Sequence, residues 1–167
     1  MKLTLREMVL YAFCGTVCFF GQVVMAGLPN IEPVSLFVML MAVCFGRKSI
    51  IAVYVFVLLE FLIYGFSLWN VFYLYVWAIL FYAAWLLRRQ TSVLPFAFLS
   101  ALFGLSFGAL CSLVYLLIGG WNTALSWWLA GLPFDAMHCI GNLVMTLLLF
   151  QPLRHLLSRY AKGQASS

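Results

Sequence analysis

The sequence predicts an all-α integral membrane protein, built as a single bundle of six transmembrane helices with both termini in the cytoplasm. Of its residues, 66% are hydrophobic and only 8% are charged, and the mean hydropathy is +1.11. A soluble domain is about half apolar and about a quarter charged. Because one span takes about 20 apolar residues, a chain of 167 residues holds roughly five to seven spans with short turns.

Turn-forming residues divide the chain into six apolar segments. The predicted helices cover Thr4–Ala26, Ile31–Phe45, Ser49–Tyr64, Val71–Leu87, Leu94–Ile118 and Pro133–Phe150. The second is short for a full span. The Trp-rich stretch 121–132 is expected to lead into the last helix as a connection, with Pro133 in the first helical turn. Residues 1–160 are predicted to form one membrane domain and residues 161–167 a polar, disordered tail.

The basic residues fix the predicted orientation. All nine fall on the same side of a six-helix arrangement, whereas five or seven crossings would scatter them over both faces. They are Lys2, Arg6, Arg47, Lys48, Arg88, Arg89, Arg154, Arg159 and Lys162. Cytoplasmic loops of membrane proteins are enriched in Lys and Arg, so this side is expected to be cytoplasmic. The net charge of +5 therefore indicates a membrane topology and no nucleic-acid partner.

Three of the four acidic residues fall in the outer half of this arrangement. Glu32 opens the second helix, Glu60 lies one turn before the outer end of the third, and Asp135 lies in the first turn of the sixth. An unpaired carboxylate in a membrane costs a few kcal/mol and usually marks a cavity, a partner or a pathway. We therefore expect these carboxylates to line a functional cavity.

Aromatic and polar residues accompany these acids at the outer connections. Asp135, His138 and Asn142 are spaced to share one helical face, as are Glu60 and Tyr64. Aromatic walls with a few convergent polar groups are typical of small-ligand sites. The predicted substrate-binding residues are Asn30, Glu32, Glu60, Tyr64, Trp69, Asn70, Tyr73, Trp77, Trp121, Trp128, Asp135, His138 and Asn142.

Structural roles for some of these residues stay open. Trp and Tyr gather at membrane interfaces whatever the function. Asn30 is equally suited to cap the second helix, whose positive end Glu32 favours. A lone histidine such as His138 is more often a hydrogen-bonded bundle residue than a metal ligand. For Glu60, nothing in the local sequence offers a structural explanation.

The chain carries no signature of catalysis, metal binding or a cofactor. The five cysteines lie inside apolar runs without a CxxC pair, and no HExxH, Walker or dinucleotide motif is present. Ser100, Ser106 and Ser112 lack a nucleophile motif. We therefore expect no enzyme, no metal and no cofactor. An intramembrane hydrolase using His138 is a disfavoured alternative.

Small residues predict two helix contacts. Gly104 and Gly108 form a GxxxG pattern that is expected to pack within the bundle. On the first helix, Ala12 and Thr16, with Gly15 beside them, are expected to face another membrane protein.

Three segments resemble the substrate-specific S components of energy-coupling factor (ECF) transporters. They are Leu28-Pro-Asn-Ile-Glu-Pro-Val34, the tract Tyr64-Gly-Phe with Tyr73-Leu-Tyr-Val-Trp77, and Gly131-Leu-Pro-Phe-Asp135 followed by His138 and Gly141-Asn142. The resemblance covers about residues 5 to 155. It implies a six-helix subunit of the bacterial cytoplasmic membrane that binds a vitamin or related micronutrient from outside.

The resemblance also implies partners. Such proteins associate with a transmembrane coupling subunit of the EcfT type and two cytoplasmic ATPases, and they are thought to topple in the membrane with the occupied site. The family's AxxxA coupling motif maps onto Ala12 and Thr16, where threonine in place of the second alanine is a departure. The missing Walker motifs agree with ATP use by the partners.

The predicted substrate is neutral or cationic and carries a flat ring. No Lys or Arg lies on the outer half, whereas three carboxylates and six tryptophans favour stacking and cation–π contacts. Candidates are a queuosine precursor, a pyridoxine-like vitamer or cobalamin, with haem less favoured. The competing interpretation is a membrane scaffold of the MreD type, which predicts no pocket.

Overall fold

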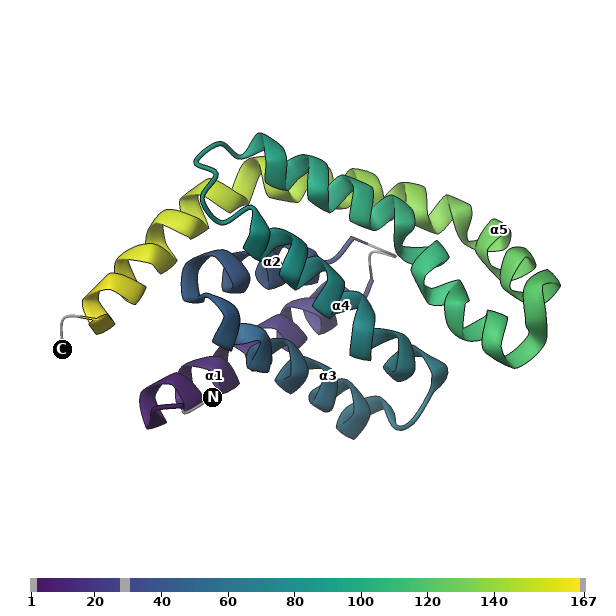
Figure 1. Ribbon diagram of the computed structural model, residues 1–167, viewed down its shortest axis with the longest axis horizontal. Helices are drawn as coiled ribbons and strands as arrows, with labels where there is room; N and C mark the ends of the chain where they lie inside the picture. The colour runs from purple at the N-terminus through teal and green to yellow at the C-terminus, as the bar shows by residue number, and fades with distance from the viewer. Residues whose placement is uncertain (1–2, 28–30, 166–167) are drawn as a thin grey trace.

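The computed structural model describes residues 3–27 and 31–165, and helices joined by short turns and loops make up this part of the chain (Figure 1). Its elements are α1 (Leu5–Val24), α2 (Val34–Phe45), the 3-10 turn η1 (Arg47–Ser49), α3 (Ile50–Tyr64), α4 (Leu68–Leu86) and α5 (Leu94–Ala165). The all-α prediction is confirmed for the described residues. The first four predicted helices match α1 to α4, with boundaries that differ by at most three residues.

Local capping explains where the early helices begin and end. The backbone N–H of Thr4 donates to Glu7 Oε2 at 2.9 Å, and the N–H of Glu7 donates to the Thr4 hydroxyl at 3.2 Å. This reciprocal pair satisfies two of the free N–H groups at the start of α1. Helices α2 and α3 end at Gly46 and Gly65, whose φ angles of 75° and 77° suit glycine.

Helix α2 lies at the centre of the fold. It packs against α4 and α5, while α1 lies along α3. Eight of the twelve α2 residues are buried, so this helix is covered on most sides by protein. Gly15 brings α1 close to α3, because a Cβ at this position would lie 2.5 Å from the carbonyl oxygen of Ala52.

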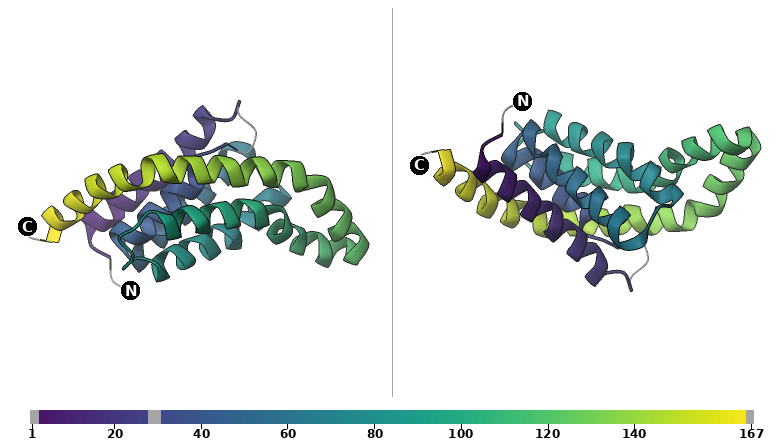
Figure 2. Two further views of the ribbon diagram at one scale, coloured as in Figure 1. Left: turned by 90° about the horizontal axis from the view of Figure 1, so that it is seen from above. Right: turned by 90° about the horizontal axis from the view of Figure 1, so that it is seen from below.

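Helix α5 reverses direction at Gly120, which adopts a non-helical conformation with φ 76° and ψ −175°. A first arm (94–119) and a second arm (121–165) run back along each other from this point (Figure 2). The predicted Trp-rich connection is wrong, because residues 121–132 are helical and Pro133 lies inside the second arm. The turn needs only one glycine, so the residues after it are free to form helix at once. The second arm also continues beyond Phe150 to Ala165, into the predicted tail.

The number of spans differs from the prediction of six. In the described part of the chain, three helices are long and apolar enough to cross a membrane, namely Leu5–Val24, Leu68–Leu86 and Leu94–Ala161. Helices α2 and α3 are not among these candidates because they are too short. They have 12 and 15 residues, whereas one crossing takes about 20. The third candidate contains both arms of α5. These helices suggest a multi-pass membrane protein.

The basic segments meet at one end of the molecule. Lys48 Nζ lies 2.9 Å from Glu7 Oε1, Arg154 donates to the backbone oxygen of Arg88 at 3.2 Å, and Cys44 Sγ lies 3.9 Å from the carbonyl oxygen of Arg154. The start of α1 and the end of α5 lie toward this end, opposite the reversal of α5 (Figure 2). The predicted gathering of basic residues is confirmed for these described segments.

Candidate functional site

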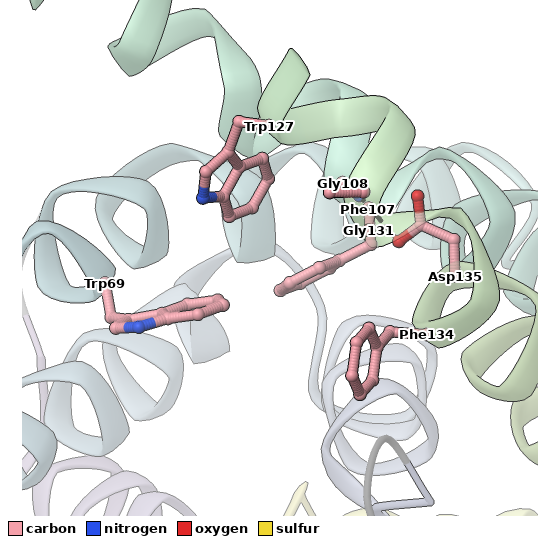
Figure 3. A pocket seen from close by; sticks show the side chains of 8 residues that line it. Trp69, Phe107, Gly108, Trp127, Gly131, Phe134 and Asp135 are labelled. Atoms are coloured by element: carbon pink, nitrogen blue, oxygen red, sulfur yellow. Dashed lines mark hydrogen bonds between the residues drawn. The ribbon is translucent and has the colours of Figure 1, made fainter. Parts of the chain in front are cut away.

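A cleft of about 440 Å³ opens between the start of α4 and the two arms of α5 (Figure 3). It lies away from the basic end, because α4 begins at the cleft and ends beside Arg88. Its volume falls within the range of roughly 300–1,000 Å³ that is usual for small-ligand sites. The cleft is lined by Trp69, Phe107, Gly108, Trp127, Ala130, Gly131, Phe134 and Asp135.

Four aromatic side chains form most of the cleft wall (Figure 3). Trp127 stacks on Tyr115 with ring centroids 4.8 Å apart, and this contact fixes the orientation of its indole. The centroid of Trp69 lies 6.2 Å from that of Trp127. Trp69 and Phe134 are 51% and 56% exposed, so part of each ring is free to contact a ligand.

Asp135 contributes a carboxylate to this aromatic wall. Its side chain is buried, and its Oδ1 accepts a hydrogen bond from the backbone N–H of Gly108 at 2.9 Å. Its Oδ2 has no partner among the described residues. A Cβ at Gly108 would overlap this carboxylate, and one at Gly104 would lie 2.7 Å from the backbone of His138. The prediction that these two glycines pack within the bundle is therefore confirmed.

Asp135, His138 and Asn142 share one face of the second arm, as predicted, and all three are buried. The ring of His138 lies 5.0 Å from that of Phe107, which lines the cleft, and His138 Nε2 has no partner in the described part. Asn142 differs, because its amide nitrogen donates to the Ser35 hydroxyl at 3.1 Å. Asn142 thus joins α5 to α2, whereas the other two residues keep free polar atoms.

Glu60 belongs to a second polar cluster beside the cleft. Burial raises the pKa of Glu32 to about 7, and the charge of the nearby Glu60 adds to this effect. Tyr73 interacts electrostatically with both carboxylates. Glu60 Oε1 and Gln22 Oε1 are buried without partners among the described residues.

Trp77 lies between the two clusters. Its ring centroid is 5.4 Å from that of Tyr73 on one side and 5.7 Å from that of Phe107 on the other. The sequence predicts one convergent constellation, but the structure divides it into a cleft around Asp135 and a neighbouring cluster around Glu60. The aromatic layer between them was not predictable from spacing along single helices.

Two predicted site residues have roles within the fold. Asn70 caps α4, since its Oδ1 accepts hydrogen bonds from the backbone N–H of Ser67 at 2.7 Å and from the Ser67 hydroxyl at 3.0 Å. Tyr64 does not share the buried face of Glu60. It is 60% exposed at the end of α3 and its ring lies 6.1 Å from that of Phe19.

The predicted tryptophans separate into different environments. Trp69 lines the cleft, Trp121 is 68% exposed and does not line it, and the indole nitrogen of Trp128 is buried without a partner in the described part. The residues missing from the prediction are Trp127, Phe107 and Phe134, together with the small residues of the wall. Helical periodicity across 121–135 would have placed Trp127 and Phe134 beside Asp135. Asn30 lies outside the described residues.

The predicted partner-binding residues of α1 have different surroundings. Gly15 is buried against α3, so it is not available to another protein, contrary to the prediction. Ala12 is exposed. Thr16 is half-buried, and its hydroxyl donates to the Ala12 carbonyl oxygen at 2.9 Å.

Unpartnered buried atoms concentrate in the predicted site. In the described part of the chain, six buried side-chain polar atoms lack a hydrogen-bond partner, and five of them belong to predicted site residues. The five are Glu60 Oε1, Trp77 Nε1, Trp128 Nε1, Asp135 Oδ2 and His138 Nε2. Each such atom costs about 1–3 kcal/mol, and folded proteins rarely leave one without a reason. A polar ligand would supply partners for atoms of this kind.

Among the described residues, no three His, Cys, Asp or Glu side chains are placed to hold a metal ion. Comparisons of the chain with family models, with curated proteins and with solved structures find no match.

Proposed function

We propose that this protein is the substrate-binding subunit of an ECF-type importer in the bacterial cytoplasmic membrane. It would capture a neutral or cationic, ring-bearing micronutrient at the outer face and deliver it inward with an EcfT-type coupling subunit and two ATPases. The observation that carries the proposal is the aromatic cleft, whose wall includes the buried carboxylate of Asp135, with no partner for Oδ2 in the described part of the chain.

The location of the cleft supports capture from outside. Arg88, Arg154 and Lys48 gather at the other end of the molecule, and the positive-inside rule makes that end cytoplasmic. A ligand arriving from outside would then meet the exposed rings of Trp69 and Phe134 before reaching Asp135.

Ala12 supports the proposed contact with a coupling subunit. It is exposed on α1, and its small side chain permits close approach of another helix in lipid. Replacing Ala12 with Leu should prevent co-purification with the coupling subunit while leaving ligand binding intact. The same substitution at the equally exposed Val9 serves as the matched control. Co-purification of Ala12→Leu at the level of Val9→Leu would remove Ala12 from the proposed interface.

The two alternatives agree less well with the geometry. A scaffold of the MreD type has no need of a 440 Å³ cleft with a free carboxylate oxygen. A hydrolase needs a serine bonded to His138, but the hydroxyls of Ser100 and Ser112 donate to backbone carbonyls of their own helix, and His138 Nε2 has no partner among the described residues.

A thermal-shift screen of the purified protein against a panel of vitamins and related heterocycles tests the proposal. A ligand at about 100 times its dissociation constant adds about 2.7 kcal/mol to the free energy of unfolding. The Trp69→Ala variant should lose this shift, whereas Trp121→Ala, an exposed tryptophan outside the cleft, should keep it. If no panel member stabilises the wild type, or if both variants respond fully, the proposal fails.

A further inference from the structure

We infer that the occupant of the cleft is a flat organic cation, such as a protonated or N-alkylated nitrogen heterocycle, whose charge is held by Asp135 Oδ2 against the rings of the cleft. This inference rests on the proposed function and narrows its substrate class, because a neutral or cationic ligand would equally satisfy that function.

The charged side chain that lines the cleft is the acidic Asp135. Asp135 is 4% exposed, and its only hydrogen-bond donor in the described part is the N–H of Gly108. Among the residues that the structure describes, no Lys, Arg or His lines the cleft. The ion pair of Lys48 with Glu7 lies at the other end of the molecule. A buried carboxylate without a counter-charge is unfavourable, and a ligand cation at Oδ2 removes this penalty.

Aromatic rings make up most of the cleft wall around this carboxylate. Trp69, Phe107, Trp127 and Phe134 line the same cleft as Asp135, whose carboxylate lies against Gly108 at its wall (Figure 3). The negative faces of aromatic rings attract cations, and Trp is the strongest of them. A carboxylate and several rings around one cavity are thus complementary to a delocalised positive charge.

The geometry favours a flat ligand that lies across the rings. A ring sandwiched between two others needs centroids about 7 Å apart, twice the contact distance of about 3.5 Å between carbon atoms. Trp69 and Trp127 are 6.2 Å apart with planes at 60°, so nothing inserts between them. A flat ligand can instead stack on the face of one indole and meet the other at an angle, with its cationic edge toward Asp135.

A matched pair of probes tests the charge directly. The cation 1-methylnicotinamide and the neutral 3-methylbenzamide have the same shape and differ by one ring atom. Binding of each to the wild-type protein in nanodiscs is measured by calorimetry, together with competition against any ligand from the vitamin panel. We expect the cation to bind about tenfold tighter or more, which corresponds to about 1.4 kcal/mol.

The variant Asp135→Asn isolates the carboxylate. Asparagine retains an Oδ1 that accepts the Gly108 N–H, but it loses the charge at Oδ2. This variant should bind both probes equally, while Glu7→Gln, at the basic end of the molecule, should keep the preference for the cation. If Asp135→Asn does not fold, Trp69→Leu replaces it, because an aliphatic side chain should weaken the cation selectively.

Several results would overturn the inference. They are equal or tighter binding of the neutral probe by the wild type, an unchanged preference in Asp135→Asn, loss of the preference in Glu7→Gln, and no measurable binding of the cation. A failure of the proposed function would give a different result. No member of the vitamin panel would then bind, although the cationic probe would.

Discussion

The backbone N–H of Gly108 donates to one oxygen of the Asp135 carboxylate at 2.9 Å, while the other oxygen has no partner among residues 3–27 and 31–165. This relationship depends on the missing Cβ of Gly108, since a side chain there would overlap the carboxylate. The glycine therefore lets the two arms of α5 pack together and holds the acid in place at the wall of the cleft.

Replacing Gly108 with Ala should displace the Asp135 carboxylate. We expect a loss of about 1–3 kcal/mol in stability from overpacking, and a weaker thermal shift with any ligand of the cleft. Gly131→Ala is the matched control, because a Cβ at Gly131 has nothing within 4 Å. A helical Gly-to-Ala change adds up to about 1 kcal/mol. Equal melting temperatures for the two variants would contradict this account of Gly108.

His138→Leu should separate stability from binding. His138 is 2% exposed and its Nε2 has no partner in the described part, so removing the polar atom relieves a desolvation penalty of about 1–3 kcal/mol. We expect the ligand-free variant to melt at or above the wild-type temperature and to bind ligand less tightly. A clear drop in the melting temperature without ligand would show that His138 has a structural partner.

Gly120→Ala should weaken the reversal of α5. The φ of 76° and ψ of −175° at Gly120 lie in a region that is open almost only to glycine, and other residues are destabilised there by about 1–3 kcal/mol. Thermal unfolding of this variant compared with Gly131→Ala measures the effect of conformation separately from that of the added methyl. Similar stability of the two variants would mean that the turn does not require glycine.

Glu32 should make stability depend on pH. Burial, assisted by the charge of Glu60, raises the pKa of Glu32 from 4.5 to about 7. The folded protein then binds this proton more tightly than the unfolded chain does, so stability is greatest below pH 4.5 and falls as the pH rises to about 7. Glu32→Gln should reduce this slope, whereas Glu7→Gln at the basic end should leave it unchanged. The prediction is wrong if the melting temperature of Glu32→Gln retains the full wild-type slope.

Much of the fold follows from local patterns. The glycines after α2 and α3, the capping residues of α1 and the common face of Asp135, His138 and Asn142 all depend on interactions within a few residues, so the sequence predicts them. The helical state of 121–132 was missed, because Pro133 was interpreted as the start of a helix.

The division of the predicted site into two clusters depends on packing between helices. Glu60 and Asp135 are separated by Trp77, which comes from α4 and contacts Phe107 of α5. No spacing along one helix reports such a contact. Trp127 is absent from the predicted site, because its place in the wall depends on its stacking with Tyr115 of the other arm.

Cysteine labelling at Gly131 tests most directly whether the cleft holds a ligand at the outer face. Gly131 lines the cleft and has room for a side chain, and Arg89→Cys at the exposed basic end serves as the control. In right-side-out vesicles, a membrane-impermeant maleimide should label Gly131→Cys and spare Arg89→Cys, above the background of the native cysteines. The ligand found in the vitamin panel should block that labelling. Labelling of Gly131→Cys only in inside-out vesicles, or at an unchanged rate with ligand present, would contradict the proposal.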